Sequence, residues 1–259
     1  MSLQPIGIFD SGVGGTSIWK EIHKLLPFEN TIYLADSKNA PYGEKSPEEI
    51  LALSVKNTEF LLQHDCKLIV VACNTATTNA ISYLRNRYKV PFIGIEPAIK
   101  SAALQSVAKT VGVLATKGTL SSALFHSTSK NISEQIKIIE QNGVGLVPLI
   151  EAGRVDSNET RELLRTYLAP MIKEGIDHLV LGCTHYPYLI PVLKELLPDT
   201  VQIIDSGEAV ARQTKNVLER NLLLASARSS KHQFYTNANV AILNDFIKEY
   251  KLNATYLDF

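Results

Sequence analysis

Short apolar runs rich in β-branched residues alternate with longer amphipathic stretches along most of this chain. The apolar runs predict strands at residues 6–10, 31–36, 68–73, 91–96, 110–116, 136–140, 178–183 and 201–205. The amphipathic stretches predict helices at residues 17–26, 46–63, 76–88, 97–106, 121–129, 158–175, 188–196 and 208–219. Near-continuous apolar strands separated by helices are typical of buried parallel sheets, so we expect an α/β fold.

Two pairs of these strands resemble each other at similar spacings in the chain. Residues 6–11 align with 111–116, and residues 68–75 align with 178–185. Buried parallel strands often look alike, but that does not explain why both strands of the second pair end in a cysteine, Cys73 and Cys183. We therefore expect two pseudo-symmetric, doubly wound domains with parallel sheets, comprising residues 1–96 plus 207–259 and residues 97–206.

The location of the two cysteines predicts a site between these domains. Open parallel sheets bind ligands outside the carboxyl ends of their strands. Two such halves facing each other would bring Cys73 and Cys183 to opposite walls of one cleft.

Composition narrows the class of protein and of partner. The chain has 259 residues, 45% of them hydrophobic, with 26 basic and 26 acidic side chains, which is typical of a globular protein. Without clustered positive charge we expect no nucleic-acid or anionic-membrane surface, and a small molecule is the expected partner. The apolar run at 68–73 is far too short to span a membrane, and the N-terminus lacks a signal sequence, so we expect a cytoplasmic protein.

The settings of the cysteines distinguish two of them from the third. Cys73 follows an apolar strand and precedes a polar turn that opens a helix, and a helix N-terminus lowers the pKa of a thiol. Cys183 repeats this setting, with His185 two residues further on. Cys66 has no partner motif and is expected to be a small buried hydrophobe.

Two other roles for these thiols remain open. Cys183 and His185 together with Cys73 could bind zinc, although the usual spacings of structural zinc sites are missing. Cys73 and Asn74 could belong to a papain-like nucleophilic site, but that would leave the second thiol unexplained.

The glycine-rich segment at residues 10–17 permits two interpretations. Gly12 and Gly14 match part of a dinucleotide fingerprint, and Asp36 would then be the ribose-binding carboxylate. However, Ser17 occupies the third small position, and Asp10 would place a negative charge beside the pyrophosphate. Alternatively, the glycines let a small ligand approach the backbone closely, and Asp10 either faces that ligand or caps the following helix.

Six motifs together resemble one family. They are FDSGVGG (9–15), PYG (41–43), CNTAT (73–77), ATKGT (115–119), VPLIE (147–151) and GCTHYP (182–187). The chain is similar, over nearly its whole length, to the glutamate racemases of the cofactor-independent aspartate/glutamate racemase superfamily. The resemblance implies interconversion of L- and D-glutamate, supplying D-glutamate for peptidoglycan, with no cofactor and no metal. Aspartate racemase is the alternative, and a homodimer is the expected assembly.

The resemblance also implies roles for individual residues. The catalytic pair would be Cys73 and Cys183, with Asp10 assisting Cys73, and His185 and Glu151 acting on the Cys183 side. The implied substrate-binding residues are Asp10, Ser11, Tyr42, Gly43, Asn74, Thr75, Thr184 and His185. Thr116, Lys117 and Thr119 lie at the matching strand end of the second half and are further candidates.

Overall fold

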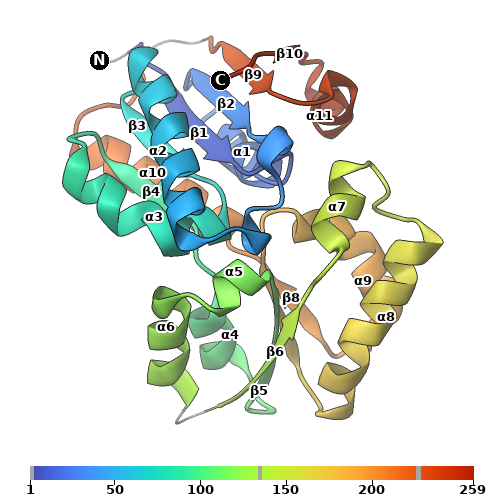
Figure 1. Ribbon diagram of the computed structural model, residues 1–259. Coiled ribbons are helices and arrows are strands. Elements are labelled where there is room, and N and C mark those ends of the chain that lie inside the picture. Colours follow the sequence, from blue (N-terminus) through green and yellow to red (C-terminus); the bar gives the residue numbers. More distant parts are fainter. Residues whose placement is uncertain (1–2, 134–135, 226–228) are drawn as a thin grey trace.

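The computed structural model describes residues 3–133, 136–225 and 229–259 and contains two parallel sheets (Figure 1). The first sheet comprises β1 (Ile6–Asp10), β2 (Thr31–Ala35), β3 (Leu68–Val71), β4 (Phe92–Gly94), β9 (His232–Thr236) and β10 (Ala254–Tyr256). The second comprises β5 (Thr110–Ala115), β6 (Lys137–Asn142), β7 (His178–Gly182) and β8 (Gln202–Ile204). All the strand pairs are parallel, which confirms the predicted α/β class.

The two sheets repeat one topology. The first runs β10-β9-β2-β1-β3-β4 and the second β6-β5-β7-β8, so β1 corresponds to β5 and β3 to β7. These are the strands that the sequence alignment paired. The predicted pseudo-symmetry is therefore confirmed, with two C-terminal strands added to the first sheet.

The helices divide in the same way (Figure 1). Around the first sheet lie α1 (Thr16–Leu25), α2 (Pro47–Gln63), α3 (Asn74–Arg87), α10 (Gly207–Arg220), α11 (Val240–Ile247) and the short helices η1 (Ser37–Asn39), η2 (Tyr42–Glu44) and η4 (Lys248–Tyr250). Around the second lie α4 (Ile99–Gln105), α5 (Lys117–Leu120), α6 (Ala123–Ser133), α7 (Leu146–Glu151), α8 (Asn158–Lys173), α9 (Ile190–Leu196) and η3 (Tyr186–Leu189). We call these two groups of elements the first and second parts.

The predicted strands and helices are present, but besides the short helices η1, η2 and η4, five further elements were missed. They are α5, α7, α11, β9 and β10, which are all short. A helix of four or six residues is too short for an apolar periodicity to stand out from a loop. The C-terminal elements join the first part, where α10 packs against α1. The domain boundaries at residues 96–97 and 206–207 stay a prediction.

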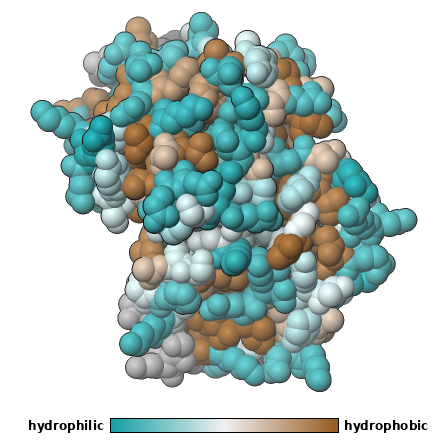
Figure 2. Space-filling model, in the orientation of Figure 1, coloured by the Kyte–Doolittle hydropathy of each residue, from teal (hydrophilic) through white to brown (hydrophobic). Residues whose placement is uncertain are grey.

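Apolar burial makes the strand ends rigid supports for a site. Every residue of β1, β3 and β7 is buried. Cys66 packs under Gly7, where an added methyl carbon would lie 3.0 Å from its sulfur. On the outer surface, hydrophobic patches are interspersed with hydrophilic ones (Figure 2). Among the described residues, no helix is long and apolar enough to cross a membrane.

A buried ion pair joins the start of β3 to the segment between α1 and β2, and both of its partners also contact the chain that follows α10. The Lys67 ammonium lies 2.6 Å from Glu29, with side-chain exposures of 1% and 3%. Lys67 also donates to the Leu223 carbonyl at 2.7 Å, and Glu29 accepts from the Ala225 amide at 2.7 Å. The pair therefore ties the C-terminal return segment to the base of the strand that carries Cys73.

Replacing Lys67 with alanine should strongly destabilise the fold, because Glu29 would remain buried without its counter-charge. We expect a loss of about 3 to 5 kcal/mol in the free energy of unfolding, measured by urea denaturation. Lys24→Ala, which breaks the exposed pair with Glu21, should cost less than about 1 kcal/mol. Equal midpoints for the two variants would contradict a structural role for the buried pair.

Candidate active site

A small cavity lies where the first and second parts meet. It is nearly closed, with an internal volume of about 10 Å³. Its lining comes from both parts and consists of Ser11, Pro41, Tyr42, Gly43, Cys73, Asn74, Thr75, Thr116, Val147, Cys183 and His185. Cys73 follows β3 and Cys183 follows β7, which are equivalent strands. The pseudo-symmetry therefore brings two equivalent thiols to one cavity.

Cys73 is the N-cap of α3, as the sequence indicated. Its sulfur accepts from the Ala76 amide at 3.4 Å, and its thiol donates to the Ser11 hydroxyl at 3.7 Å. Burial, followed by the nearby Asp10 carboxylate, raises the pKa of Cys73 well above its usual range despite these contacts. The expectation of a lowered pKa was wrong, because the loss of hydration outweighs one helix terminus. Cys73 is a protonated thiol in this state.

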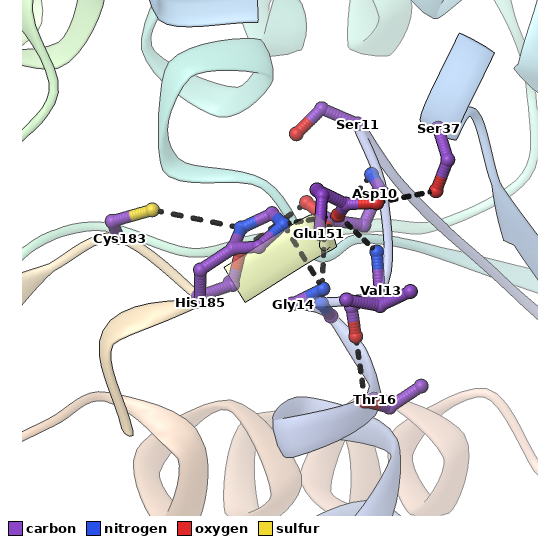
Figure 3. A network of polar contacts seen from close by, with 12 residues as sticks. Asp10, Ser11, Val13, Gly14, Thr16, Ser37, Glu151, Cys183 and His185 are labelled. Atoms are coloured by element: carbon purple, nitrogen blue, oxygen red, sulfur yellow. Dashed lines mark hydrogen bonds and ion pairs between the residues drawn. The ribbon is translucent and has the colours of Figure 1, made fainter. Parts of the chain in front are cut away.

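Cys183 begins a chain of polar contacts that ends at a carboxylate (Figure 3). Its sulfur lies 3.7 Å from His185 Nδ1, and His185 Nε2 lies 2.5 Å from Glu151 Oε1. Burial lowers the pKa of His185, but contacts with Cys183 and Glu151 outweigh it and hold this pKa well above the ordinary value.

Glu151 is the carboxylate partner of this histidine, and it links the two parts. It accepts from the Val13 amide at 2.6 Å and from the Ser37 hydroxyl at 2.7 Å. Burial raises the pKa of Glu151, but the hydrogen bonds from His185, Ser37 and Val13 together lower it by more. The pKa of Glu151 therefore lies below its usual value. His185 and Glu151 are thus an imidazolium–carboxylate pair at neutral pH.

The glycine-rich loop packs around this pair. A methyl carbon on Gly12 would lie 1.9 Å from Glu151 Oε1, and one on Gly14 would lie 2.2 Å from His185 Nδ1. The expectation that these glycines admit a small ligand was therefore wrong, because the protein's own side chains occupy that space. Sequence reasoning could not find this contact, since the loop and Glu151 are far apart in the chain.

Asp10 lies behind the cavity wall rather than on it. Its Oδ2 accepts from the amides of Gly15 at 2.8 Å and Gly12 at 3.3 Å, and its Oδ1 accepts from the Thr184 hydroxyl at 3.2 Å. Burial raises the pKa of Asp10 to about 6, although His185 lowers it. Asp10 and Thr184 therefore form a second layer that connects the two parts beneath the thiols.

Tyr42 borders the cavity, but its hydroxyl is already engaged. It donates to Asp36 Oδ2 at 2.5 Å and accepts from Asn57 at 3.1 Å. Asp36 also accepts from Asn39 and Asn237, so it is not free to bind a ribose. These contacts argue against the dinucleotide interpretation and leave Tyr42 as a fixed wall.

Asn74 offers unused hydrogen-bonding capacity beside the thiols. Both polar atoms of its side chain are buried and have no hydrogen-bond partner in the described part of the chain. Buried polar atoms are nearly always paired, so an unpaired amide in a cavity wall indicates a place for a polar ligand. The neighbouring Thr75 hydroxyl is paired across the junction with those of Thr116 at 2.8 Å and Thr119 at 3.3 Å.

The sequence-predicted residues thus separate into two groups. Those on the cavity wall are Ser11, Tyr42, Gly43, Cys73, Asn74, Thr75, Thr116, Cys183 and His185, whereas the further candidates Lys117 and Thr119 are not among the lining residues. Asp10, Glu151 and Thr184 support the wall from behind. The sequence analysis did not single out Pro41, Val147 or Ser37, the hydrogen-bond partner of Glu151. Pro41 and Val147 do lie within the PYG and VPLIE motifs, which were the only signal that could have found them. No cluster of metal-binding side chains occurs within residues 3–133, 136–225 and 229–259.

Comparisons with known proteins agree with this geometry. The chain is 47% identical over 240 residues to the glutamate racemase of Ectopseudomonas mendocina, covering 92% of this chain and 91% of that one. Its structure matches a glutamate racemase isoform of Bacillus anthracis with a TM-score of 0.88 at 32% identity, over 99% and 98% of the two chains.

A second solved structure, the Escherichia coli glutamate racemase in complex with L-glutamate and the activator UDP-MurNAc-ala, matches with a TM-score of 0.86 at 33% identity, over 98% and 97% of the chains. The family model for Asp/Glu/Hydantoin racemase matches residues 6–214, which include both thiols and every residue placed around them. On this evidence the chain belongs to the Asp/Glu/Hydantoin racemase family.

Proposed function

We propose that this protein is a glutamate racemase that interconverts L- and D-glutamate without a cofactor and supplies D-glutamate for peptidoglycan synthesis. The observation that carries the proposal is the pair of thiols, Cys73 and Cys183, lining one cavity from two equivalent strands. The relatives at 45–47% identity bear the name glutamate racemase, which favours glutamate over the alternative substrate aspartate.

Racemisation needs one proton carrier on each face of the α-carbon. In the proposed reaction, a thiolate on one wall removes the α-proton and becomes a thiol, and the electron pair of the broken C–H bond stays on the substrate. The thiol on the opposite wall donates its proton to the other face and becomes a thiolate. No atom is left over, and the reverse reaction exchanges the two roles.

The two thiols have different electrostatic surroundings in the free protein. Cys73 holds its proton because burial raises its pKa. On the other side, the positively charged His185 lies 3.7 Å from the Cys183 sulfur and stabilises negative charge there. We therefore infer that Asp10 acts on the Cys73 side, and that His185 and Glu151 act on the Cys183 side.

Substrate binding would use uncharged polar groups together with the His185 imidazolium. We propose that Ser11, Gly43, Asn74 and Thr75 contact the substrate from one part and His185 from the other. Asp10 and Thr184 would act from the layer behind, and Tyr42 through its main chain, since its hydroxyl is engaged. Backbone amides and hydroxyls at helix starts bind carboxylates without arginine. The buried amide of Asn74 supports this arrangement most directly.

We further propose a cytoplasmic homodimer with domains at residues 1–96 plus 207–259 and 97–206. The division is supported by the chain path, since β4 ends at Gly94, β5 begins at Thr110, and α10 begins at Gly207.

Replacing either Cys73 or Cys183 with alanine should reduce racemisation of L-glutamate by at least about 10²- to 10⁴-fold, because each face loses its proton carrier. Circular dichroism of glutamate measures the reaction directly. Cys66→Ala is the matched control, since Cys66 is buried outside the cavity, and this variant should keep its activity. Substantial activity in either cavity variant would refute the two-thiol assignment.

Heavy water should reveal how the proton travels. Starting from L-glutamate, the first D-glutamate formed should carry deuterium at the α-carbon while the remaining L-glutamate stays protonated, because the donating thiol exchanges with solvent. Proton NMR of the two enantiomers at low conversion gives both quantities. D-glutamate that keeps the original proton would indicate a single base working on both faces.

Glu151→Gln should shift the alkaline limb of the pH–activity profile to lower pH. The Glu151 charge helps hold the pKa of His185 above its ordinary value against burial. Without it, His185 loses its proton at lower pH, and activity that requires the imidazolium falls earlier by more than about one pH unit. Profiles of kcat/KM for the wild type and for the exposed control Glu140→Gln should coincide. An unmoved limb in Glu151→Gln would contradict this role.

A further inference from the structure

A second hollow adjoins the thiol cavity on its outer side, and we call it the vestibule. Its volume is about 210 Å³. Four of its lining residues, Pro41, Gly43, Thr116 and Val147, also line the thiol cavity. These shared residues, which belong to both parts of the molecule, form a wall common to the two spaces.

The wall between the two spaces is a close contact between η2 and the start of α5, and Figure 1 shows α5 at the junction of the two parts. A methyl carbon on Gly43 would lie 2.8 Å from Thr116 Cβ, and one on Gly118 would lie 3.1 Å from Gly43 Cα. The hydroxyls of Thr75 and Thr116 close the same contact at 2.8 Å. A molecule that passes from the vestibule to the thiols must part this contact.

Charged residues flank this contact directly in the sequence. Lys117 follows Thr116 on the second part, Glu44 follows Gly43 on the first part, and both line the vestibule with exposed side chains. Across residues 3–133, 136–225 and 229–259, the Lys117 ammonium has no hydrogen-bond or ion-pair partner. Its charge is therefore available to a ligand in the vestibule.

The thiol cavity itself has little positive charge with which to attract an acidic amino acid. In the described part of the chain, its lining includes neither lysine nor arginine. The charge of His185 is balanced by Glu151 at 2.5 Å, and Asp10 lies close behind. Glutamate carries two carboxylates and one ammonium at neutral pH, so its net charge is negative and this interior does not draw it in.

Building on the proposed function, we propose that the vestibule is an entry subsite for the acidic amino acid, where Lys117 binds a substrate carboxylate before the contact opens. Glu44 on the facing part repels anions that lack an ammonium group, so the subsite favours amino dicarboxylates. Lys117 directly follows Thr116, so we expect a carboxylate bound at Lys117 to accept the hydrogen bond of the Thr116 hydroxyl in place of Thr75. Capture and opening thus occur at adjacent residues.

Lys117→Gln tests this subsite by removing the charge. We expect kcat/KM for glutamate to fall by about two- to fivefold at low salt, and by about tenfold in Lys117→Glu, with the change in KM rather than kcat. Lys117→Arg should restore kcat/KM. The difference from wild type should shrink towards zero in about 1 M salt, where the screening length is about 3 Å.

The control is Lys100→Gln, which removes an exposed lysine from α4 that lines neither space. Equal kcat/KM for the Lys100 and Lys117 variants, or a loss in Lys117→Gln that persists at high salt, would overturn the entry subsite. Wild-type turnover tests the proposed function separately. NMR line-shape analysis gives the association rate of glutamate, which compares the variants without relying on their catalytic rates. This association rate should be highest with lysine or arginine at residue 117, lower with glutamine and lowest with glutamate.

Discussion

The structure depends on one constraint, which is that the carboxyl ends of two parallel sheets face each other. In the first sheet β1 lies between β2 and β3, and in the second sheet β5 lies between β6 and β7. The connections that follow neighbouring strands therefore run to opposite sides of the sheet, and a crevice opens between them at the carboxyl ends. Cys73 and Cys183 occupy the equivalent position in the two crevices. Neither half alone encloses a site, because the lining of the cavity comes from both.

Burial of charge determines the chemistry that this cavity can perform. Asp10 and His185 are buried and Glu151 is mostly so, and a buried charge is tolerated only when it is paired and hydrogen-bonded. Glu151 is paired with His185 and accepts hydrogen bonds from Ser37 and Val13. Asp10 accepts hydrogen bonds from two backbone amides and from the Thr184 hydroxyl. The result is an interior that is polar but nearly balanced in charge, which suits the proposed reaction, in which one sulfur accepts a proton and the other donates one.

The same contacts hold the two parts together on both sides of the cavity. On one side Glu151 of α7 reaches the Ser37 hydroxyl at the start of η1, and on the other Thr116 meets the Thr75 hydroxyl. Each joins a residue of the first part to one of the second. Thr75 and Thr116 also line the cavity, so one of these two contacts between the parts belongs to the cavity wall itself.

The sequence by itself determined the α/β class, the repeated unit and the two thiols, because buried parallel strands are continuous apolar runs and local order places Cys73 at a helix start. It did not determine the state of that thiol, since the pKa of Cys73 depends on burial and on Asp10, which is remote in the chain. Only the tertiary structure decided what Gly12 and Gly14 accommodate, because Glu151 and His185 reach them from the second part. Through-space packing and desolvation have no signature in a local pattern of residues, and both act between segments that the chain order keeps far apart.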